Sequence, residues 1–275
     1  MAPGSSTRRR ASSRAHTPWA LGAPAALGAL LLVVPLVGLL LRAPWSGLPR
    51  ILSTPEVADA LRLSLLSATL ATGISLVLGV PLAWVLARSE LPGLRLLRAL
   101  VTLPLVLPPV VGGVALLLVL GRNGLVGQHL DAGLGITIPF TTAAVVIAET
   151  FVAMPFLVVA VEGALRSADR GYDEAAATLG ASRLTVFRRV TLPLIRPALV
   201  AGGVLCWARA LGEFGATVTF AGNLQGTTRT MPLAVYLAME TDPDAALALS
   251  LVLLAVSVAV LFALRGRWFG VGGAA

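Results

Sequence analysis

The apolar residues of this chain are gathered into long blocks that polar segments separate. Six blocks have roughly the 20 residues that an α-helix needs to cross about 30 Å of hydrocarbon. These predicted spans are residues 19–41, 61–87, 97–120, 139–161, 197–221 and 245–264. A shorter apolar stretch, 231–239, is too brief to cross, so we expect a helix that lies at or dips into the outer surface. The pattern predicts an all-α integral membrane protein with six transmembrane helices.

Capping residues and prolines mark where several of these helices are expected to begin. Residues 53–56, Ser-Thr-Pro-Glu, combine a capping box with a proline at the first helical position, and predict a short helix leading into the second span. Asp242, followed by proline, predicts the start of the last span, and Pro197 predicts the start of the fifth.

The third span is rich in residues that disturb a helix, namely Pro104, Pro108, Pro109, Gly112 and Gly113. Proline removes a backbone donor, so this span cannot form an unbroken ladder of hydrogen bonds. Carbonyl groups freed at membrane depth must face protein or a water-filled path. Two interpretations stay open: a packing kink with glycine contacts between helices, or a segment that lines a pore.

Composition and charge agree with a membrane protein. The chain is 57% hydrophobic and 12% charged, which is too apolar for a soluble domain of this length. Its net charge of +8 comes from basic residues at the ends of apolar blocks, with few aromatic residues, so we expect lipid and no nucleic acid as its partner. Fifteen arginines lie in residues 1–18, 88–98, 166–196 and 265–267, all on one side of a six-span arrangement. Both termini are therefore predicted to be cytoplasmic, with 1–18 as a disordered tail.

Several kinds of chemistry are excluded by residue type. All 21 basic residues are arginine, so the chain carries no phosphate-binding P-loop with its lysine and no Schiff-base lysine. Cys206 is the only cysteine, and His16 and His129 are far apart, so we expect no disulfide and no metal site. We expect no enzyme activity and no cofactor, and any ATP would be bound and hydrolysed by another subunit.

The polar segment between the fourth and fifth predicted spans, 171–197, is patterned for helices. Asp173 suits the positive end of a first helix, and Gly180 is placed to end that helix in a left-handed cap. Ser182 can cap a second helix, which Pro193 is expected to end. The result is a helix-turn-helix between two spans, and the alternative is a solvated loop that only joins them.

This segment also matches a known signature: Glu174, Ala175, Ala176, three residues, Gly180, nine residues, Val190, one residue, Leu192 and Pro193. It resembles the EAA signature of ABC importer permeases, with Val190 where isoleucine is usual. In that family the signature helix is the coupling helix, which docks on the ATP-binding subunit and passes its motion to the spans. The resemblance implies a type I ABC importer permease fold, with a core at 55–265, and a coupling segment at 171–193. It assigns ATPase coupling to Glu174, Ala175, Ala176, Gly180, Leu192 and Pro193.

Two charges lie inside the fifth predicted span. A charged group at the bilayer centre is unfavourable by about 3 kcal/mol or more, so Arg209 and Glu213, four residues apart, are expected to pair and face the interior. A purely structural ion pair is the alternative. The surrounding string RALGEFGAT, with TLPLVLPPVVGG and TRTMPLAVYLAME elsewhere, is similar to molybdate importer permeases. Sulfate and thiosulfate permeases share a related GEFG segment, so molybdate or tungstate ranks above sulfate.

The resemblance covers about residues 50–265 and has further implications. The gate would include Arg209, Glu213, Phe214, Pro104 and Pro108. The partners would be a second copy of the chain, two ATP-binding cassette subunits and an extracytoplasmic oxyanion-binding protein, in a bacterial inner membrane. A secondary transporter is the main rival, but it would be expected to carry intramembrane carboxylates in two matching halves. Only Glu149, Glu162 and Glu213 lie in or beside spans, and no internal repeat is evident.

Overall fold

The computed structural model describes residues 19–169 and 171–268, so the predicted tail at 1–18 lies outside the described part. The described residues form helices joined by turns and loops, without a strand among them. The chain divides into two compact units, Met1–Ala43 and Pro44–Ala275. The first contains α1 (Trp19–Leu41), which matches the first predicted span and stays helical through Pro24 and Pro35. The second contains all the other helices.

The second span is one long helix. After α2 (Leu48–Leu52), α3 runs unbroken from Pro55 to Arg88 over 34 residues, with Pro55 in its first turn. The capping box predicted here is wrong, because the Ser53 and Thr54 hydroxyls donate back to the carbonyls of Arg50 and Ile51. These carbonyls end α2 and lack helical donors, so they compete successfully for the hydroxyls. Residues 55–60, predicted as a short helix of their own, are the first turns of α3.

The third span is broken, as its prolines predict. It consists of α4 (Leu94–Val106) and α5 (Pro109–Leu120), which meet at an angle of 120°. Leu107 and Pro108 at the bend both have extended backbones, with ψ of 132° and 129°. Each precedes a proline, whose ring disfavours the helical conformation in the residue before it. A short helix, α6 (Gly127–Leu134), follows.

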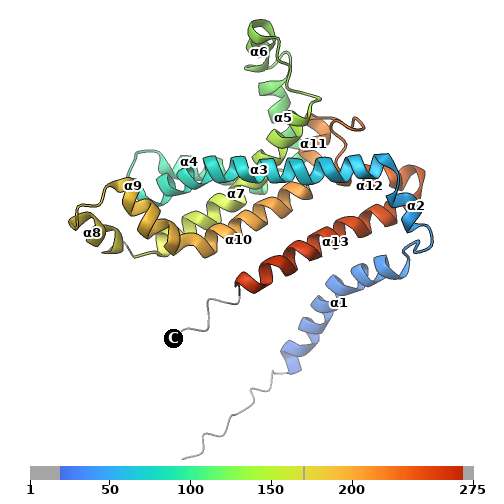
Figure 1. Ribbon diagram of the computed structural model, residues 1–275, viewed down its shortest axis with the longest axis horizontal. Coiled ribbons are helices and arrows are strands. Elements are labelled where there is room, and N and C mark those ends of the chain that lie inside the picture. The colour runs from blue at the N-terminus through green and yellow to red at the C-terminus, as the bar shows by residue number, and fades with distance from the viewer. Residues whose placement is uncertain (1–18, 170, 269–275) are drawn as a thin grey trace, which may run out of the picture. The chain divides into compact units, whose positions relative to one another are not determined.

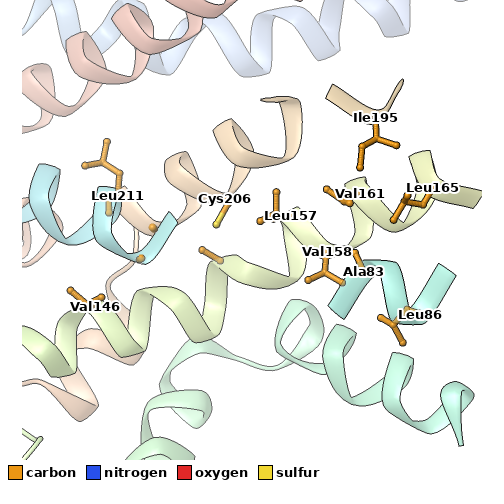
Figure 2. Packing of buried hydrophobic residues seen from close by; sticks show 14 residues of the cluster. Ala83, Leu86, Val146, Leu157, Val158, Val161, Leu165, Ile195, Cys206 and Leu211 are labelled. Atoms are coloured by element: carbon orange, nitrogen blue, oxygen red, sulfur yellow. The ribbon is translucent and has the colours of Figure 1, made fainter. Parts of the chain in front are cut away.

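The fourth span, α7 (Thr142–Ser167), lies at the centre of the second unit. It starts after Thr141, whose Oγ1 accepts from the Ala144 amide at 3.3 Å, and not at Pro139 as predicted. The helix packs against α3 and against α10 (Leu192–Leu211), which run beside it in Figure 1. Figure 2 shows the apolar cluster that these helices share, with labelled side chains Ala83, Leu86, Val146, Leu157, Val158, Val161, Leu165, Ile195, Cys206 and Leu211.

The fifth span differs most from its prediction. One continuous helix runs from Arg183 to Leu211, formed by α9 (Arg183–Val186), a π-helical turn at Phe187–Thr191, and α10. Pro193 therefore does not end a helix and Pro197 does not begin one. In the π-turn the Leu192 amide reaches back five residues to the Phe187 carbonyl. This wider turn lets the helix continue into α10 although Pro193 and Pro197 have no N–H group to donate.

The remaining helices complete the second unit. The fifth predicted span ends early at Leu211, and α11 (Gly215–Phe220) follows as a separate short helix. The predicted surface helix is α12 (Met231–Thr241), which packs on α3 and α13 (Pro243–Trp268). Asp242 caps α13 as predicted, because its Oδ1 accepts from two amides of the first turn at 3.1 Å. Five described helices are long and apolar enough to cross a membrane, and the number is six if the bent α4–α5 pair is counted as one span.

Candidate functional site

The first helix of the segment that joins α7 to α10 has the predicted form. It is α8 (Gly171–Thr178), two turns long, with acidic residues in its first turn. Gly180 adopts the left-handed conformation, with φ of +83°. Its amide donates to the Ala177 carbonyl at 3.0 Å, and the next amide donates to Ala176 at 3.1 Å. These bonds satisfy carbonyls at the end of α8, so Gly180 fixes the direction in which the chain leaves the helix.

The second helix of this segment starts as expected but does not stop. Ser182 caps α9, since its Oγ accepts from the Thr185 amide at 3.3 Å. The helix then continues through the π-turn into α10. Leu192 and Pro193, the last two residues of the signature, lie in the first turn of α10. The signature therefore extends from the short helix α8 to the first turn of the membrane helix α10.

The signature face of α8 is open. Glu174, Ala175 and Gly180 are exposed, Ala176 is partly buried, and α8 has no buried residue. A large apolar side chain beside them, Leu179, is 89% exposed. This side of α8 is therefore accessible to another molecule.

Asp173 connects α8 to the membrane helices, a role that sequence reasoning missed. Its Oδ1 accepts from the Thr191 hydroxyl at 3.0 Å, at the root of α10. Its Oδ2 lies 3.5 Å from a terminal nitrogen of Arg88, the last residue of α3. The Arg88 side chain is only 9% exposed, and it also donates to the Ala168 carbonyl. We call this arrangement the Asp173 latch, because it joins α8, α3 and α10.

At the other end of α10, Arg209 and Glu213 pair at 2.5 Å, as expected. The Glu213 side chain is 1% exposed and lies beyond the helix end, so the two residues do not share one helix face. Its Oε1 also accepts from the Ala216 amide at 2.9 Å. Glu213 therefore caps α11 while it pairs with the end of α10, and this second contact was not predicted.

The broken spans meet at this point through glycines. A Cβ on Gly215, at the start of α11, would lie 3.0 Å from the Cβ of Pro109, at the start of α5. A Cβ on Gly113 would lie 2.8 Å from the carbonyl oxygen of Ala216. The backbones of α5 and α11 are thus in close contact, which supports the packing interpretation of the glycines in the third span.

The other predicted gate residues surround this contact without all touching one another. The Phe214 ring packs on Tyr236 of α12, with centroids 5.2 Å apart. Pro108 lies exposed at the α4–α5 bend, next to Pro109, and Pro104 lies within α4. Within the described residues, the hydrogen bonds and ion pairs of Arg209 and Glu213 do not involve these two prolines, so their part in a gate stays a prediction.

A further carboxyl group is buried between the spans. Glu149 of α7 is 1% exposed, and its Oε1 accepts from the Ser67 hydroxyl of α3 at 2.8 Å. Nearby on α3, the Ser64 hydroxyl accepts from the Met231 amide of α12 at 2.7 Å. These polar contacts tie α3 to α7 and α12 inside an otherwise apolar bundle. Within the described ranges, no three His, Cys, Asp or Glu side chains are grouped to hold a metal ion.

Solved structures support the architecture. The crystal structure of a bacterial ABC transporter involved in the import of the acidic polysaccharide alginate matches 92% of this chain and 95% of its own chain. The TM-score is 0.73 and the sequence identity 20%, so the likeness shows the fold alone. The predicted all-α fold of a type I ABC importer permease is confirmed.

Sequence relatives are closer. The molybdenum transport system permease protein ModB of Mycobacterium bovis is 52% identical, over 89% of this chain and 92% of the relative. The sulfate transport system permease protein CysT of Salmonella typhimurium is 38% identical, over 86% of each chain. Residues 75–269 match the family model of the inner membrane component of binding-protein-dependent transport systems. With its membrane helices and its open signature helix, the chain therefore belongs to the family of inner membrane components of binding-protein-dependent transport systems.

Proposed function

We propose that this chain is the permease subunit of an ATP-driven importer of molybdate or tungstate. Two copies would form the pathway, with two ATP-binding cassette subunits and an extracytoplasmic binding protein. The observation that carries the proposal is the identity of 52% to a molybdenum permease along almost the whole chain, against 38% to a sulfate permease. The absence of lysine supports hydrolysis of ATP by the partner subunits, because a P-loop needs that residue.

The coupling step follows from the connections of α8. Its exposed face would dock on the ATP-binding subunit, with Glu174 available to pair with a basic residue there. Closure of the ATPase would then push α8, and the Asp173 latch would carry the displacement to the ends of α3 and α10. A continuous helix from Arg183 to Leu211 has 29 residues and a length of about 43 Å. It would transmit the displacement across the membrane to the Arg209–Glu213 pair.

The far end of α10 is where the pathway would open. Glu213 joins α10 to α11, and α11 packs on α5 through Gly113 and Gly215. A tilt of α10 would therefore shift both broken spans together. A dianion needs favourable partial charges on its route, and Arg209 with the amides near Gly212 and Gly215 would supply them. Glu213 would prevent Arg209 from trapping the anion.

Uptake in reconstituted vesicles tests the proposal. Vesicles containing the chain, its ATPase subunit and its binding protein should accumulate radiolabelled molybdate only when ATP is supplied to the ATPase side. A fivefold excess of unlabelled tungstate should compete, and the same excess of sulfate should not. Competition by sulfate would favour a sulfate permease instead. Uptake driven by a proton or sodium gradient without the ATPase subunit would make the chain a secondary transporter.

A further inference from the structure

A cavity of about 460 Å³ lies where α3 ends, α4 begins and α7 ends. Three arginines line it, one from each helix: Arg88, Arg98 and Arg166. These helix ends lie beside α8 and α9 in Figure 1, at the opposite end of α3 from α12. The cavity is therefore distant from the Arg209–Glu213 pair. Arg88 also belongs to the Asp173 latch, but the route proposed above for the anion does not pass through the cavity.

The arginines are held in place but carry an excess of positive charge. Glu162 accepts from the Nε atoms of Arg98 and Arg166, at 2.8 and 2.9 Å. Asp173 lies 3.5 Å from Arg88. Three guanidinium groups thus face two carboxylates, which leaves one net positive charge. The Glu162 side chain is only 9% exposed, so a buried carboxylate holds the Nε atoms of Arg98 and Arg166.

Some N–H donors of these three arginines have no acceptor among the described residues. Arg98 and Arg166 each use Nε on Glu162 and one terminal nitrogen on the Leu86 carbonyl. Among the described residues, their other terminal nitrogens have no hydrogen-bond acceptor. The Arg88 side chain is only 9% exposed, and its Nε is buried without a hydrogen-bond partner. The Arg98 and Arg166 side chains are 34% and 51% exposed, so water can reach their donors, and the Nε of Arg88 is the buried one of the three. A buried charged donor without an acceptor is unfavourable.

We propose that this cavity binds a tetrahedral oxyanion of the phosphate type. Guanidinium groups present paired donors that match the oxygens of such an anion, and here three of them line one cavity. An anion there would neutralise the excess charge and supply acceptors to the remaining donors. The cavity lies at the ends of membrane helices, so the phosphate of an anionic lipid headgroup can reach it, as can a free oxyanion from water.

The test uses the purified full-length chain in nanodiscs of neutral phosphatidylcholine, in a buffer without phosphate. In one arm, phosphatidylglycerol replaces part of the lipid; in the other, inorganic phosphate is added at constant ionic strength. The thermal unfolding midpoint is the readout. We expect at least one arm to raise the midpoint by several degrees. A rise with phosphatidylglycerol alone identifies a lipid headgroup, and a rise with phosphate identifies a free oxyanion.

Two matched variants decide whether the cavity is responsible. Arg166→Gln removes one donor group and leaves Glu162 paired with Arg98, while Arg95→Gln removes an exposed charge on α4 outside the cavity. Arg166→Gln should need about tenfold more anion for the same rise, the effect of losing one charge-assisted hydrogen bond. Arg95→Gln should respond as the wild type does. No rise in either arm with the wild-type chain, or equal responses of the two variants, would overturn the proposal.

Discussion

Among single residues, Gly180 has the clearest effect on the path of the chain after α8. Its φ of +83° is a conformation that a side chain makes unfavourable by about 1 kcal/mol or more. Gly180→Trp should redirect the chain after α8 and lower molybdate uptake at least tenfold, while the membrane helices remain folded. Gly180→Asn is the control, because asparagine tolerates the left-handed region best among residues with a side chain. Wild-type uptake by a well-expressed Gly180→Trp variant would contradict the coupling role.

Arg209 provides a second prediction for a single residue. Arg209→Gln leaves the buried Glu213 carboxylate without its partner, which is unfavourable by about 3–5 kcal/mol. Uptake in reconstituted vesicles should fall strongly. The double variant Arg209→Gln, Glu213→Gln removes both charges and keeps a side-chain oxygen for the Ala216 amide. If only the double variant regains transport, the pair is structural, and if neither does, Arg209 acts on the anion.

Individual residues also show where sequence reasoning reaches its limit. The signature at 174–193 is local, so its helix and its glycine cap could be predicted from spacing alone. The Asp173 latch joins residues that are far apart in the chain, and no local pattern indicates that Arg88 ends α3 beside α8. The second contact of Glu213 was missed for a related reason: its carboxyl caps α11 only because the fifth span breaks at Gly212.

Among the elements, prolines illustrate both success and failure of prediction. Three prolines at 104–109 predicted a third span without an unbroken hydrogen-bond ladder, because proline lacks a backbone donor. The bend lies where two consecutive residues precede a proline, whose ring disfavours the helical conformation. Pro193 and Pro197 were expected to mark helix ends, yet one helix passes through both. A π-helical turn at Phe187–Thr191, which the sequence does not reveal, precedes Pro193 and lets the helix accommodate it. Apolar length predicted which segments become membrane helices better than it predicted where each helix starts and stops.

The connection between elements can be tested at the Asp173 latch. Asp173→Ala removes the acceptor for Thr191 and the partner of Arg88, so α8 should move without carrying α3 and α10. ATP hydrolysis by the assembled complex should continue, while the molybdate imported per ATP should drop several-fold. Asp169→Asn is the control, since Asp169 is exposed and, among the described residues, accepts from the nearby Gly171 amide and does not contact Arg88 or Thr191. An unchanged transport ratio in Asp173→Ala would show that α8 does not act through the latch.

Packing between α5 and α11 makes another prediction for the elements. A methyl group at Gly113 would overlap the Thr219 hydroxyl and the Ala216 backbone, so Gly113→Ala should push the helices apart. Such overpacking is unfavourable by about 1–3 kcal/mol, and the thermal unfolding midpoint should fall by several degrees. Gly73→Ala on α3 meets no atom within 4 Å and should leave the midpoint unchanged or slightly higher. Equal midpoints for the two variants would refute close packing here.

At the scale of the whole molecule, the arginine distribution predicts orientation. Labelling with a membrane-impermeant maleimide tests it, because the single native cysteine, Cys206, is buried. Gln225→Cys, between α11 and α12, should react in intact spheroplasts. Glu90→Cys, between α3 and α4, should react only after the membrane is opened. The reverse pattern would place the signature helix α8 outside the cell, where no ATPase subunit could reach it.

The length of α3 has a consequence for the surrounding lipid. Its 34 residues extend about 51 Å, and even without the first two turns, which carry charges up to Arg62, about 39 Å remain. A hydrocarbon layer of about 30 Å is thinner than this, so α3 must tilt to keep its apolar side chains out of water. Thicker bilayers would bring the helix more upright, so we expect transport to depend on acyl chain length.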